Sequence, residues 1–346
     1  MNFLSPLKSS KSMNLLLTSM ETGVYSAPKW VKVDISGEVS ISDQSRHASV
    51  FLDEITTWLV TGRAKTFVDG TVGYGGHGER LLERAGDGAV LVGIDRDEEA
   101  LAFSRARLAG FGSRAILLKG DFVDMKQLLR SVDIAVIDGA LLDLGVSSPQ
   151  LDDSHRGFSF QEDGPLDMRM DQSAGTTAGE LVNSLPESEL ADLIFQYGEE
   201  RFSRRIARAI VRARERKPLA TTQELTTVIK ESVPAAYRHG RIHCATRTFQ
   251  ALRIAVNREL DVLEPAIRDA VDMLRPGGRI AVISFHSLED RIVKHTFRAL
   301  AERPHPRVTV LTKKPHVPSD AECRANPRAR SAKLRVAERL SQESVQ

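Results

Sequence analysis

The stretch that decides the fold is Asp69-Gly70-Thr71-Val72-Gly73-Tyr74-Gly75-Gly76-His77-Gly78, which directly follows a short apolar run at residues 66–69. Gly73, Gly75 and Gly78 fit the spacing Gly-x-Gly-x-x-Gly, and Asp95 ends the next apolar run. Glycines at these positions let the backbone turn sharply and approach a ligand at a helix start, while the acidic residue binds ribose hydroxyls. This order of elements predicts a site for an adenosine-containing ligand, without distinguishing a dinucleotide from another ligand of that kind.

Around this loop, apolar runs alternate with helical patterns. Strands are expected at residues 66–69, 89–94 and 115–118. A fourth is expected between 134 and 144, where Asp138-Gly139 interrupts the run and leaves open which half is the strand. A helix is expected at 98–108. Continuous apolar strands separated by helices are typical of a parallel sheet covered on both faces. The predicted fold class is therefore α/β, with a Rossmann-like sheet.

After residue 150 the alternation stops. Helices are expected at 187–195, 201–216 and 222–232, followed by a long helix at 246–274 with Pro265 as a candidate break. Further strands are expected at 279–284, 308–311 and 333–337. This order predicts one sheet domain in two segments, 46–156 and 246–340, with an inserted all-helical subdomain at 157–245 for substrate recognition. Residues 1–45 lack a regular apolar period. They are interpreted as a disordered extension, or as the result of a translation start assigned too far upstream.

Composition excludes some classes of protein. The chain has 346 residues and a net charge of +2, and no stretch approaches the ~18 uninterrupted apolar residues that a membrane helix needs. Cys244 and Cys323 are too few for a disulfide framework, so a reducing compartment is predicted. Segment 201–217 has eight basic residues and one acidic residue, and segment 298–339 has eleven and four. These surpluses favour a polyanion partner, although a solvated helix face and a basic tail explain them equally well.

The carboxylates near the glycine loop favour a cationic ligand over a dinucleotide. Asp69 stands at the tip of the first strand, where a pyrophosphate would lie, and would repel it. Strands three and four end in Asp121-Phe122 and Asp143. S-adenosylmethionine carries a sulfonium, an ammonium and an adenine amine, and therefore suits carboxylates. Leu274-Arg275-Pro276-Gly277-Gly278, before a strand, is the helix-to-strand turn typical of class I methyltransferases. Together these features predict such an enzyme.

The sequence also narrows what is methylated. Carbon-5 methylation of a pyrimidine needs a cysteine thiolate, and neither Cys244 nor Cys323 stands in a Pro-Cys context after the fourth strand. DNA amino-methyltransferases carry a Pro-Pro-aromatic tripeptide there, but Ser147-Ser148-Pro149-Gln150 occupies the place. His239, His243 and Cys244 resemble metal ligands without a convincing fourth ligand, so no metal is predicted.

Five blocks carry a resemblance to a known family. They are Asp143-Leu144-Gly145-Val146-Ser147-Ser148-Pro149-Gln150-Leu151-Asp152, Gly164-Pro165-Leu166-Asp167-Met168-Arg169-Met170, Thr246-Arg247-Thr248-Phe249-Gln250-Ala251-Leu252-Arg253-Ile254, Ser284-Phe285-His286-Ser287-Leu288-Glu289-Asp290-Arg291 and Asn326-Pro327-Arg328-Ala329-Arg330-Ser331-Ala332-Lys333-Leu334-Arg335. Over about residues 46–340 the chain resembles the bacterial 16S rRNA (cytosine-N4)-methyltransferases, the RsmH or MraW family. The resemblance implies S-adenosylmethionine as cofactor, 16S rRNA of the small ribosomal subunit as partner, and a cytoplasmic location. It also implies methylation of a cytidine N4 amine in the decoding (P-site) region, and it leaves a homodimer open.

Carried over position by position, the resemblance implies cofactor contacts at Gly75, Gly76, His77, Asp95, Phe122, Asp143 and Gln150. The group that accepts an N–H hydrogen bond from the amine is left open among Asp143, Asp167, Asn257 and His286. Two of these have plainer interpretations, since His286 could cap the last parallel strand and Asn257 could face solvent. For RNA, Arg204, Arg208 and Arg212 form one charged helix face suited to phosphates. The alternative is that they pair with Glu199, Glu200 or other carboxylates.

Two rival functions stay open at this point. The glycine loop alone would suit a nicotinamide-dependent oxidoreductase, which a shift in thermal stability with S-adenosylhomocysteine or with NAD would separate from a methyltransferase. A non-catalytic ribosome-assembly factor could keep the fold for binding RNA. Gly75, Gly76 and Asp95 argue against the assembly factor, since a protein that no longer binds a cofactor has no reason to keep them.

Overall fold

The computed structural model describes residues 31–33, 39–41, 49–62 and 64–341. The chain forms two units, residues 1–48 and 49–346. In the first unit, strands β1 (Val31–Val33) and β2 (Val39–Ile41) pair antiparallel, with Val31 opposite Ile41. The prediction of a disordered extension at 1–45 otherwise falls outside the described residues.

The second unit is built on a sheet that contains seven of the described strands, in the order β5-β4-β3-β6-β7-β9-β8. Their bounds are β3 (Thr66–Asp69), β4 (Val90–Asp95), β5 (Ala115–Lys119), β6 (Ile137–Asp143), β7 (Leu274–Ser284), β8 (Val308–Val310) and β9 (Lys333–Arg339). Strands β3 to β7 run parallel, whereas β9 is antiparallel to both β7 and β8. The predicted α/β class is confirmed. The chain steps outward from β3 to β5 and then restarts on the other side with β6, so the topological switch point lies between β3 and β6.

Strand β6 shows how the structure resolves the ambiguous fourth run. Asp138-Gly139 lies inside one continuous strand, with a register shift between Ile137 and Gly139. The Asp138 carboxylate accepts the backbone N–H groups of Lys65 and Thr66, both at 2.9 Å. Asp138 is therefore tolerated within the strand because it satisfies the backbone where β3 begins.

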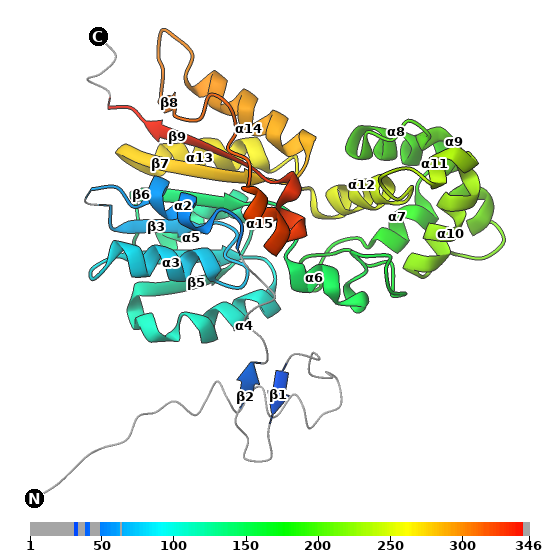
Figure 1. Cartoon of the computed structure of the whole chain (residues 1–346), viewed down its shortest axis with the longest axis horizontal. Coiled ribbons are helices and arrows are strands. Elements are labelled where there is room, and N and C mark those ends of the chain that lie inside the picture. The colour runs from blue at the N-terminus through cyan, green and yellow to red at the C-terminus, as the bar shows by residue number, and fades with distance from the viewer. Residues whose placement is uncertain (1–30, 34–38, 42–48, 63, 342–346) are drawn as a thin grey trace, which may run out of the picture. The chain divides into compact units, whose positions relative to one another are not determined.

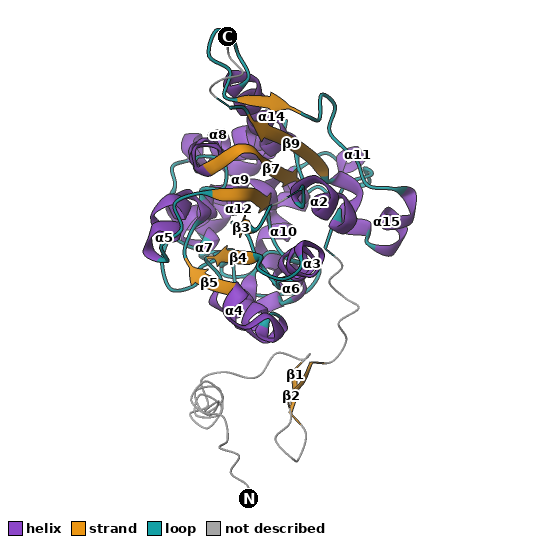
Figure 2. Cartoon of the chain, turned by 90° about the vertical axis from the view of Figure 1, so that its left-hand side faces the viewer, coloured by secondary structure: helices purple, strands orange, loops and turns teal. Residues whose placement is uncertain are grey.

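Helices cover both faces of the sheet (Figure 2). On one face, α2 (Leu52–Leu59) and α3 (Gly76–Ala85) bury Ile55, Leu59, Leu81 and Leu82 against the strands, and α4 (Glu98–Arg107) follows β4. On the other face, α5 (Met125–Ser131), α13 (Leu263–Met273) and α14 (Ser287–Leu300) contribute to a second core. The apolar strands predicted this two-sided burial.

A block of helices lies beside the carboxyl edge of the sheet (Figure 1). It contains α7 (Ala178–Ser184), α8 (Glu187–Gly198), α9 (Ser203–Arg214), α10 (Thr222–Ser232), α11 (Ala235–Arg238) and α12 (Thr246–Asn257), and α6 (Ser148–Asp152) leads into it from β6. Ile194, Ile206, Leu225 and Phe249 belong to its own core. Helix α12 contributes to this core although it falls in the predicted sheet segment 246–340, and the domain division stays a proposal.

The prediction of a single long helix at residues 246–274 is wrong, because two helices cover this range. Helix α12 ends at Asn257, where Arg258 takes a φ of +53°, and α13 begins at Leu263. Pro265 lies in the first turn of α13, where its missing N–H leaves no intrahelical hydrogen bond unmade. The chain continues after α14 through β8 and α15 (Asp320–Ala325) to β9. Across the described residues, every helix is too short or too polar to cross a membrane.

Candidate functional site

Three carboxylates end neighbouring strands at the carboxyl edge of the sheet. Asp69 ends β3, Asp95 ends β4 and Asp143 ends β6, and β3 pairs with both of the other strands. Burial raises the pKa of Asp69 to about 7 and that of Asp95 to about 6. It raises the pKa of Asp143 well above its usual value. A cationic group bound here would favour ionisation of all three carboxylates.

Asp143 keeps one acceptor atom open. Its backbone N–H donates to Thr71 Oγ1 at 2.6 Å, which fixes the end of β6 against the glycine loop. Its Oδ2 lies 3.7 Å from His77 Nδ1. Its Oδ1 is buried and has no hydrogen-bond partner among the described residues. A buried oxygen in this state is unfavourable unless a ligand supplies a donor.

Asp95 holds the glycine loop. Its carboxylate accepts the N–H of Gly73 at 2.8 Å and that of Asp97 at 2.9 Å. Gly73 and Gly75 have φ of +50° and +78°, and Gly75 is the N-cap of α3, so the turn needs residues that adopt the left-handed region easily. The two bonds use one lone pair on each carboxylate oxygen. The remaining lone pairs of Asp95 can accept ribose hydroxyls.

Gly76 and His77 begin α3 and contact the segment before α2. A Cβ at Gly76 would lie 2.2 Å from Ser49 Oγ, so a larger residue would displace that segment. The His77 ring is buried, and its Nε2 lies 2.8 Å from the carbonyl oxygen of Val50. The structure thus brings five of the predicted cofactor residues together: Gly75, Gly76, His77, Asp95 and Asp143.

Phe122 and Gln150, the other two predicted cofactor residues, flank this site differently. Phe122 is buried after β5, and its Cβ lies 3.0 Å from the position that a Cβ on Gly70 would take. Gln150 uses both ends of its amide within the protein. Its Oε1 accepts the Ser147 N–H at 2.9 Å, and its Nε2 donates to Asp97 at 2.7 Å. Phe122 therefore packs against the glycine loop, and Gln150 positions Asp97.

Asp97 is a site residue that the sequence analysis missed. Besides Gln150, it accepts a hydrogen bond from Arg156 Nη1 at 2.8 Å, and both partners of this ion pair are buried. Arg156 Nη2 also donates to the carbonyl oxygens of Arg169 and Met170, at 3.1 and 2.9 Å. The pair therefore links the end of β4 to the loop at residues 164–171. The sequence signal was a helix N-cap at Asp97, which predicts the cap and not its distant partner.

Asn257 and Asp167 hold this same 164–171 loop. At the end of α12, Asn257 Nδ2 donates to the Met168 carbonyl oxygen and its Oδ1 accepts the Met170 N–H, both at 2.8 Å. Asn257 is 6% exposed, so the interpretation that it faces solvent is wrong. Asp167 accepts two hydrogen bonds from the Arg169 guanidinium, both at 2.8 Å. Both candidates thus use their polar atoms to shape the loop.

His286 caps α14 where β7 ends. Its Nδ1 accepts the Glu289 N–H at 3.4 Å, and the Glu289 carboxylate accepts the N–H groups of Phe285 and His286 at 2.7 and 3.2 Å. Its Nε2 lies 3.2 Å from Glu289 Oε1 but forms no aligned hydrogen bond within the described residues. Burial raises the pKa of Glu289, but His286 and Arg253 outweigh that effect and lower it. Glu289 therefore stays ionised near Asp143, and its charge contributes to the raised pKa of Asp143.

The same corner has a set of groups close enough to share a cation. Ligand atoms of Glu259, His286 and Glu289 all lie within 4.8 Å of one another. Arg253 already donates to both oxygens of Glu259, at 2.9 and 2.7 Å. His286 Nδ1 already accepts the Glu289 N–H, so that nitrogen is not available to a metal ion. These contacts favour a cluster in which the protein's own side chains neutralise the carboxylates, rather than a metal site. The absence of a metal stays a prediction.

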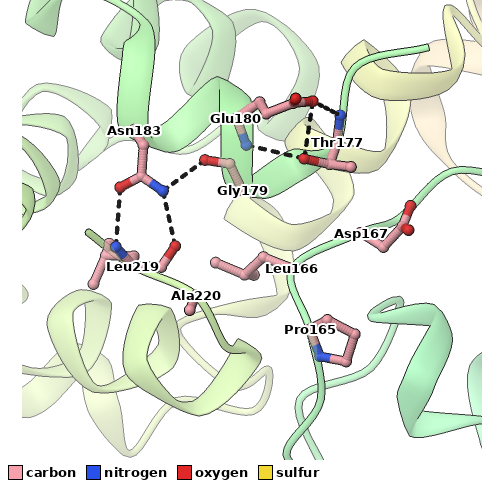
Figure 3. Close-up of a pocket in the computed structure, with 9 residues that line it drawn as sticks. All are labelled: Pro165, Leu166, Asp167, Thr177, Gly179, Glu180, Asn183, Leu219 and Ala220. Carbon is pink, nitrogen blue, oxygen red and sulfur yellow. Dashed lines mark hydrogen bonds between the residues drawn. The ribbon is translucent and has the colours of Figure 1, made fainter.

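A cavity of about 370 Å³ lies in the helical block beside Asp167 (Figure 3). The Asn183 amide in its wall donates to the carbonyl oxygens of Gly179 and Leu219 at 2.8 Å and accepts the Leu219 N–H at 2.9 Å. Thr177 and Glu180 bond each other at the start of α7. The polar groups joined by dashed lines in Figure 3 therefore satisfy one another, and the three strand-end carboxylates do not line this cavity.

The predicted RNA contacts lie apart from the carboxylates. Arg204, Arg208 and Arg212 are carried by α9, which lies at the end of the helical block remote from the sheet (Figure 1). Arg208 Nε lies 3.3 Å from Glu187 Oε1. In the part of the chain that the structure describes, Arg204 and Arg212 form no ion pair with a carboxylate. Two of the three arginines thus remain available to a phosphate.

The site as a whole suits a ligand that is cationic and lacks phosphate. Asp69 lies where a dinucleotide would place its pyrophosphate, and Asp143 offers a buried open oxygen. A sulfonium between these carboxylates gains electrostatic stabilisation, and Asp95 fits the ribose. On a sheet of this order that ligand is S-adenosylmethionine, and the protein is a class I methyltransferase.

The chain belongs to the MraW methylase family, whose family model matches residues 44–340. A ribosomal RNA small subunit methyltransferase H from Syntrophotalea carbinolica is 50% identical over 308 residues, which cover 85% of this chain and 98% of that protein. The protein of the same name from Synechococcus elongatus is 51% identical over 298 residues, covering 86% and 96%. The family that the five sequence blocks resemble is thereby confirmed.

Proposed function

We propose that this enzyme transfers a methyl group from S-adenosylmethionine to the N4 amine of a cytidine in the 16S rRNA of the small ribosomal subunit. The names of its relatives support small-subunit ribosomal RNA as the substrate. The sequence resemblance supports the base, the atom and the decoding region, together with a cytoplasmic location; a homodimer stays open. The observation that carries the chemistry is the buried, open Oδ1 of Asp143 beside Asp69 at the topological switch point.

The cytosine amine is a poor nucleophile because its lone pair is delocalised into the ring. The cofactor supplies an electrophilic methyl group on a sulfonium. The protein must take the base out of its stack, exclude water, and hold the amine nitrogen about 3–3.5 Å from the methyl carbon. Asp143 Oδ1 accepts no hydrogen bond from the described residues, and we assign it to accept one from the amine. Methyl transfer leaves the nitrogen with one proton too many, and the raised pKa of Asp143 favours its acceptance there.

The other candidates fit supporting roles. Asp167 and Asn257 are assigned to positioning, because their polar atoms already hold the 164–171 loop. His286 is assigned to keeping Glu289 in place, and the charge of Glu289 raises the pKa of Asp143. Asp143 is therefore our choice for the proton acceptor.

The test is methyl transfer in vitro. Small ribosomal subunits that lack the modification, and the naked rRNA extracted from them, are incubated with the protein and S-adenosylmethionine, and the RNA is digested to nucleosides for mass spectrometry. We expect N4-methylcytidine, and we expect S-adenosylhomocysteine rather than NAD to raise the melting temperature. A different methylated nucleoside would contradict the assigned atom. Stabilisation by NAD alone would favour the oxidoreductase instead.

A further inference from the structure

A second cavity, of about 310 Å³, lies outside the cofactor site. Its lining residues come from the first turns of α14 and from the start of β9: Ser287, Asp290, Arg291, Lys294, His295 and Lys333. Lys333 pairs with Ser284, the last residue of β7, so the cavity lies at the same edge of the sheet as the three carboxylates. Figure 1 shows α14 and β9 together on this part of the sheet.

The cavity has a surplus of positive charge. Asp290 is already neutralised, because it lies 3.1 Å from Lys333 Nζ and 2.6 Å from Arg335 Nε. Burial raises its pKa, but these two cations outweigh the effect and lower it, so Asp290 remains an anion that both of them compensate. Lys294 and His295 are exposed and form no ion pair within the described residues. An anion in the cavity would therefore contact Lys294 and His295, whose side chains are not paired with a carboxylate among the described residues.

The rim of the cavity also joins the sheet to the helical block. Glu199, which follows α8, accepts a hydrogen bond from Ser287 Oγ at 2.6 Å and pairs with Arg291 at 3.0 Å. This ion pair uses part of the Arg291 guanidinium, whose remaining N–H groups can bind an anion. A strand of nucleic acid whose base enters the site must pass across this edge of the sheet. The cavity is therefore placed on the substrate side, unlike the α9 stripe of Arg204, Arg208 and Arg212.

We propose that the cavity binds a backbone phosphate of the RNA substrate and so sets the position of the strand relative to Asp143. The proposal rests on the proposed function for the identity of the RNA. Phosphate contacts by lysine and arginine position a nucleic acid without reading its sequence. Lys294 and His295 supply the free donors, while Arg291 and Lys333 hold the walls through Glu199 and Asp290.

The test compares Lys294→Gln/His295→Gln with Arg298→Gln, which removes one charge from the same helix outside the cavity. Binding to small-subunit rRNA and to assembled subunits is measured across a salt series. The double variant should bind roughly twofold to fivefold more weakly at low salt, and its log–log salt slope should be flatter by about 0.7 to 0.9, because one lysine no longer neutralises a phosphate. Affinity for S-adenosylhomocysteine and the melting temperature should match the wild type. Lys294→Glu should weaken RNA binding further.

Three outcomes would overturn the proposal. The first is a salt slope that is unchanged in the double variant, or equally changed in Arg298→Gln. The second is weaker binding to assembled subunits with unchanged binding to naked rRNA, which would indicate a protein partner. The third is stabilisation by inorganic phosphate that the double variant loses while RNA binding stays intact, which would indicate a small-anion site. Because these readouts measure binding, a wild-type protein that makes no N4-methylcytidine would contradict the proposed function and leave the phosphate site standing.

Discussion

Candidate catalytic residues from the sequence lie at the carboxyl edge of the sheet and around the 164–171 loop. The two regions differ in whether the polar atoms of these residues already have hydrogen-bond partners in the protein. At the sheet edge, Asp143 keeps a buried oxygen without a partner in the described part of the chain. At the loop, the Asp167 carboxylate already accepts hydrogen bonds from Arg169. Asn257, at the end of α12, already bonds the loop backbone at Met168 and Met170. This difference separates a residue that is free to act on a ligand from residues that shape its surroundings.

The largest effect is expected from Asp143→Asn. The amide cannot take a proton from the amine, so kcat should fall roughly 10²- to 10⁴-fold, the range typical of a lost general base. The melting temperature should stay the same or rise, because the substitution removes a carboxylate whose ionised form is disfavoured by burial. Single-turnover methyl transfer and thermal unfolding measure the two quantities. Near-normal kcat would remove Asp143 from the chemistry.

Asn257→Ala tests the other side of the comparison. It leaves the Met168 carbonyl oxygen and the Met170 N–H without partners, and each loss of this kind costs about 1–3 kcal/mol. The melting temperature should therefore drop, and activity should fall with it. Asn257→Asp is the comparison variant. It keeps the acceptor for the Met170 N–H but loses the donor to the carbonyl oxygens of Met168 and Arg253 and adds a buried charge, so it should also be less stable than the wild type. An alanine variant that is fully stable but inactive would make Asn257 a catalytic residue.

Asp95→Ala tests the ribose contact. Loss of two charge-assisted hydrogen bonds, each worth roughly 1.5–3 kcal/mol, should weaken S-adenosylmethionine binding at least tenfold. Part of the effect will come through the loop, because Asp95 also holds the Gly73 N–H. Asp95→Asn separates the two contributions, since its amide oxygen can still accept the Gly73 bond. Calorimetry that shows unchanged affinity in both variants would contradict the ribose assignment.

The part of the site that could be predicted is the part that lies on strand ends. Apolar runs locate β3, β4 and β6, and in a parallel sheet their carboxyl ends meet at one edge, so Asp69, Asp95 and Asp143 could be placed together from the sequence. The runs also predicted the order of sheet and helical segments. Local rules failed where a distant contact decides, as at Asp138, whose partners are Thr66, the first residue of another strand, and Lys65 just before it.

The loop tethers could not be predicted for the same reason. Arg156 and Asp97 are 59 positions apart, and Asn257 and Met170 are 87 apart. A polar residue inside a helix usually faces solvent, and only the tertiary structure shows that Asn257 ends α12 against a loop. The family resemblance nominated Asn257 and Asp167, but it did not distinguish residues that touch the substrate from residues that hold the loop.

The smallest effect, and the sharpest test of the sheet edge, is the pH dependence of cofactor binding. Asp69 and Asp95 have folded-state pKa values of about 7 and about 6, both above the ordinary value of 3.8. The free folded protein therefore binds more protons than the unfolded chain between these limits, and its stability should fall as the pH rises through that window.

A sulfonium is stabilised by ionised carboxylates, so affinity for S-adenosylmethionine should rise severalfold between about pH 5 and pH 8. S-adenosylhomocysteine lacks the positive sulfur, and its affinity should rise less. Asp69→Asn should flatten the difference between the two ligands, whereas Asp163→Asn, an exposed carboxylate in the helical block, should leave it unchanged. A ratio of the two affinities that stays constant with pH in the wild type would mean that Asp69 and Asp95 do not stabilise the sulfonium, and the contrast between the sheet edge and the loop would then rest on Asp143 alone.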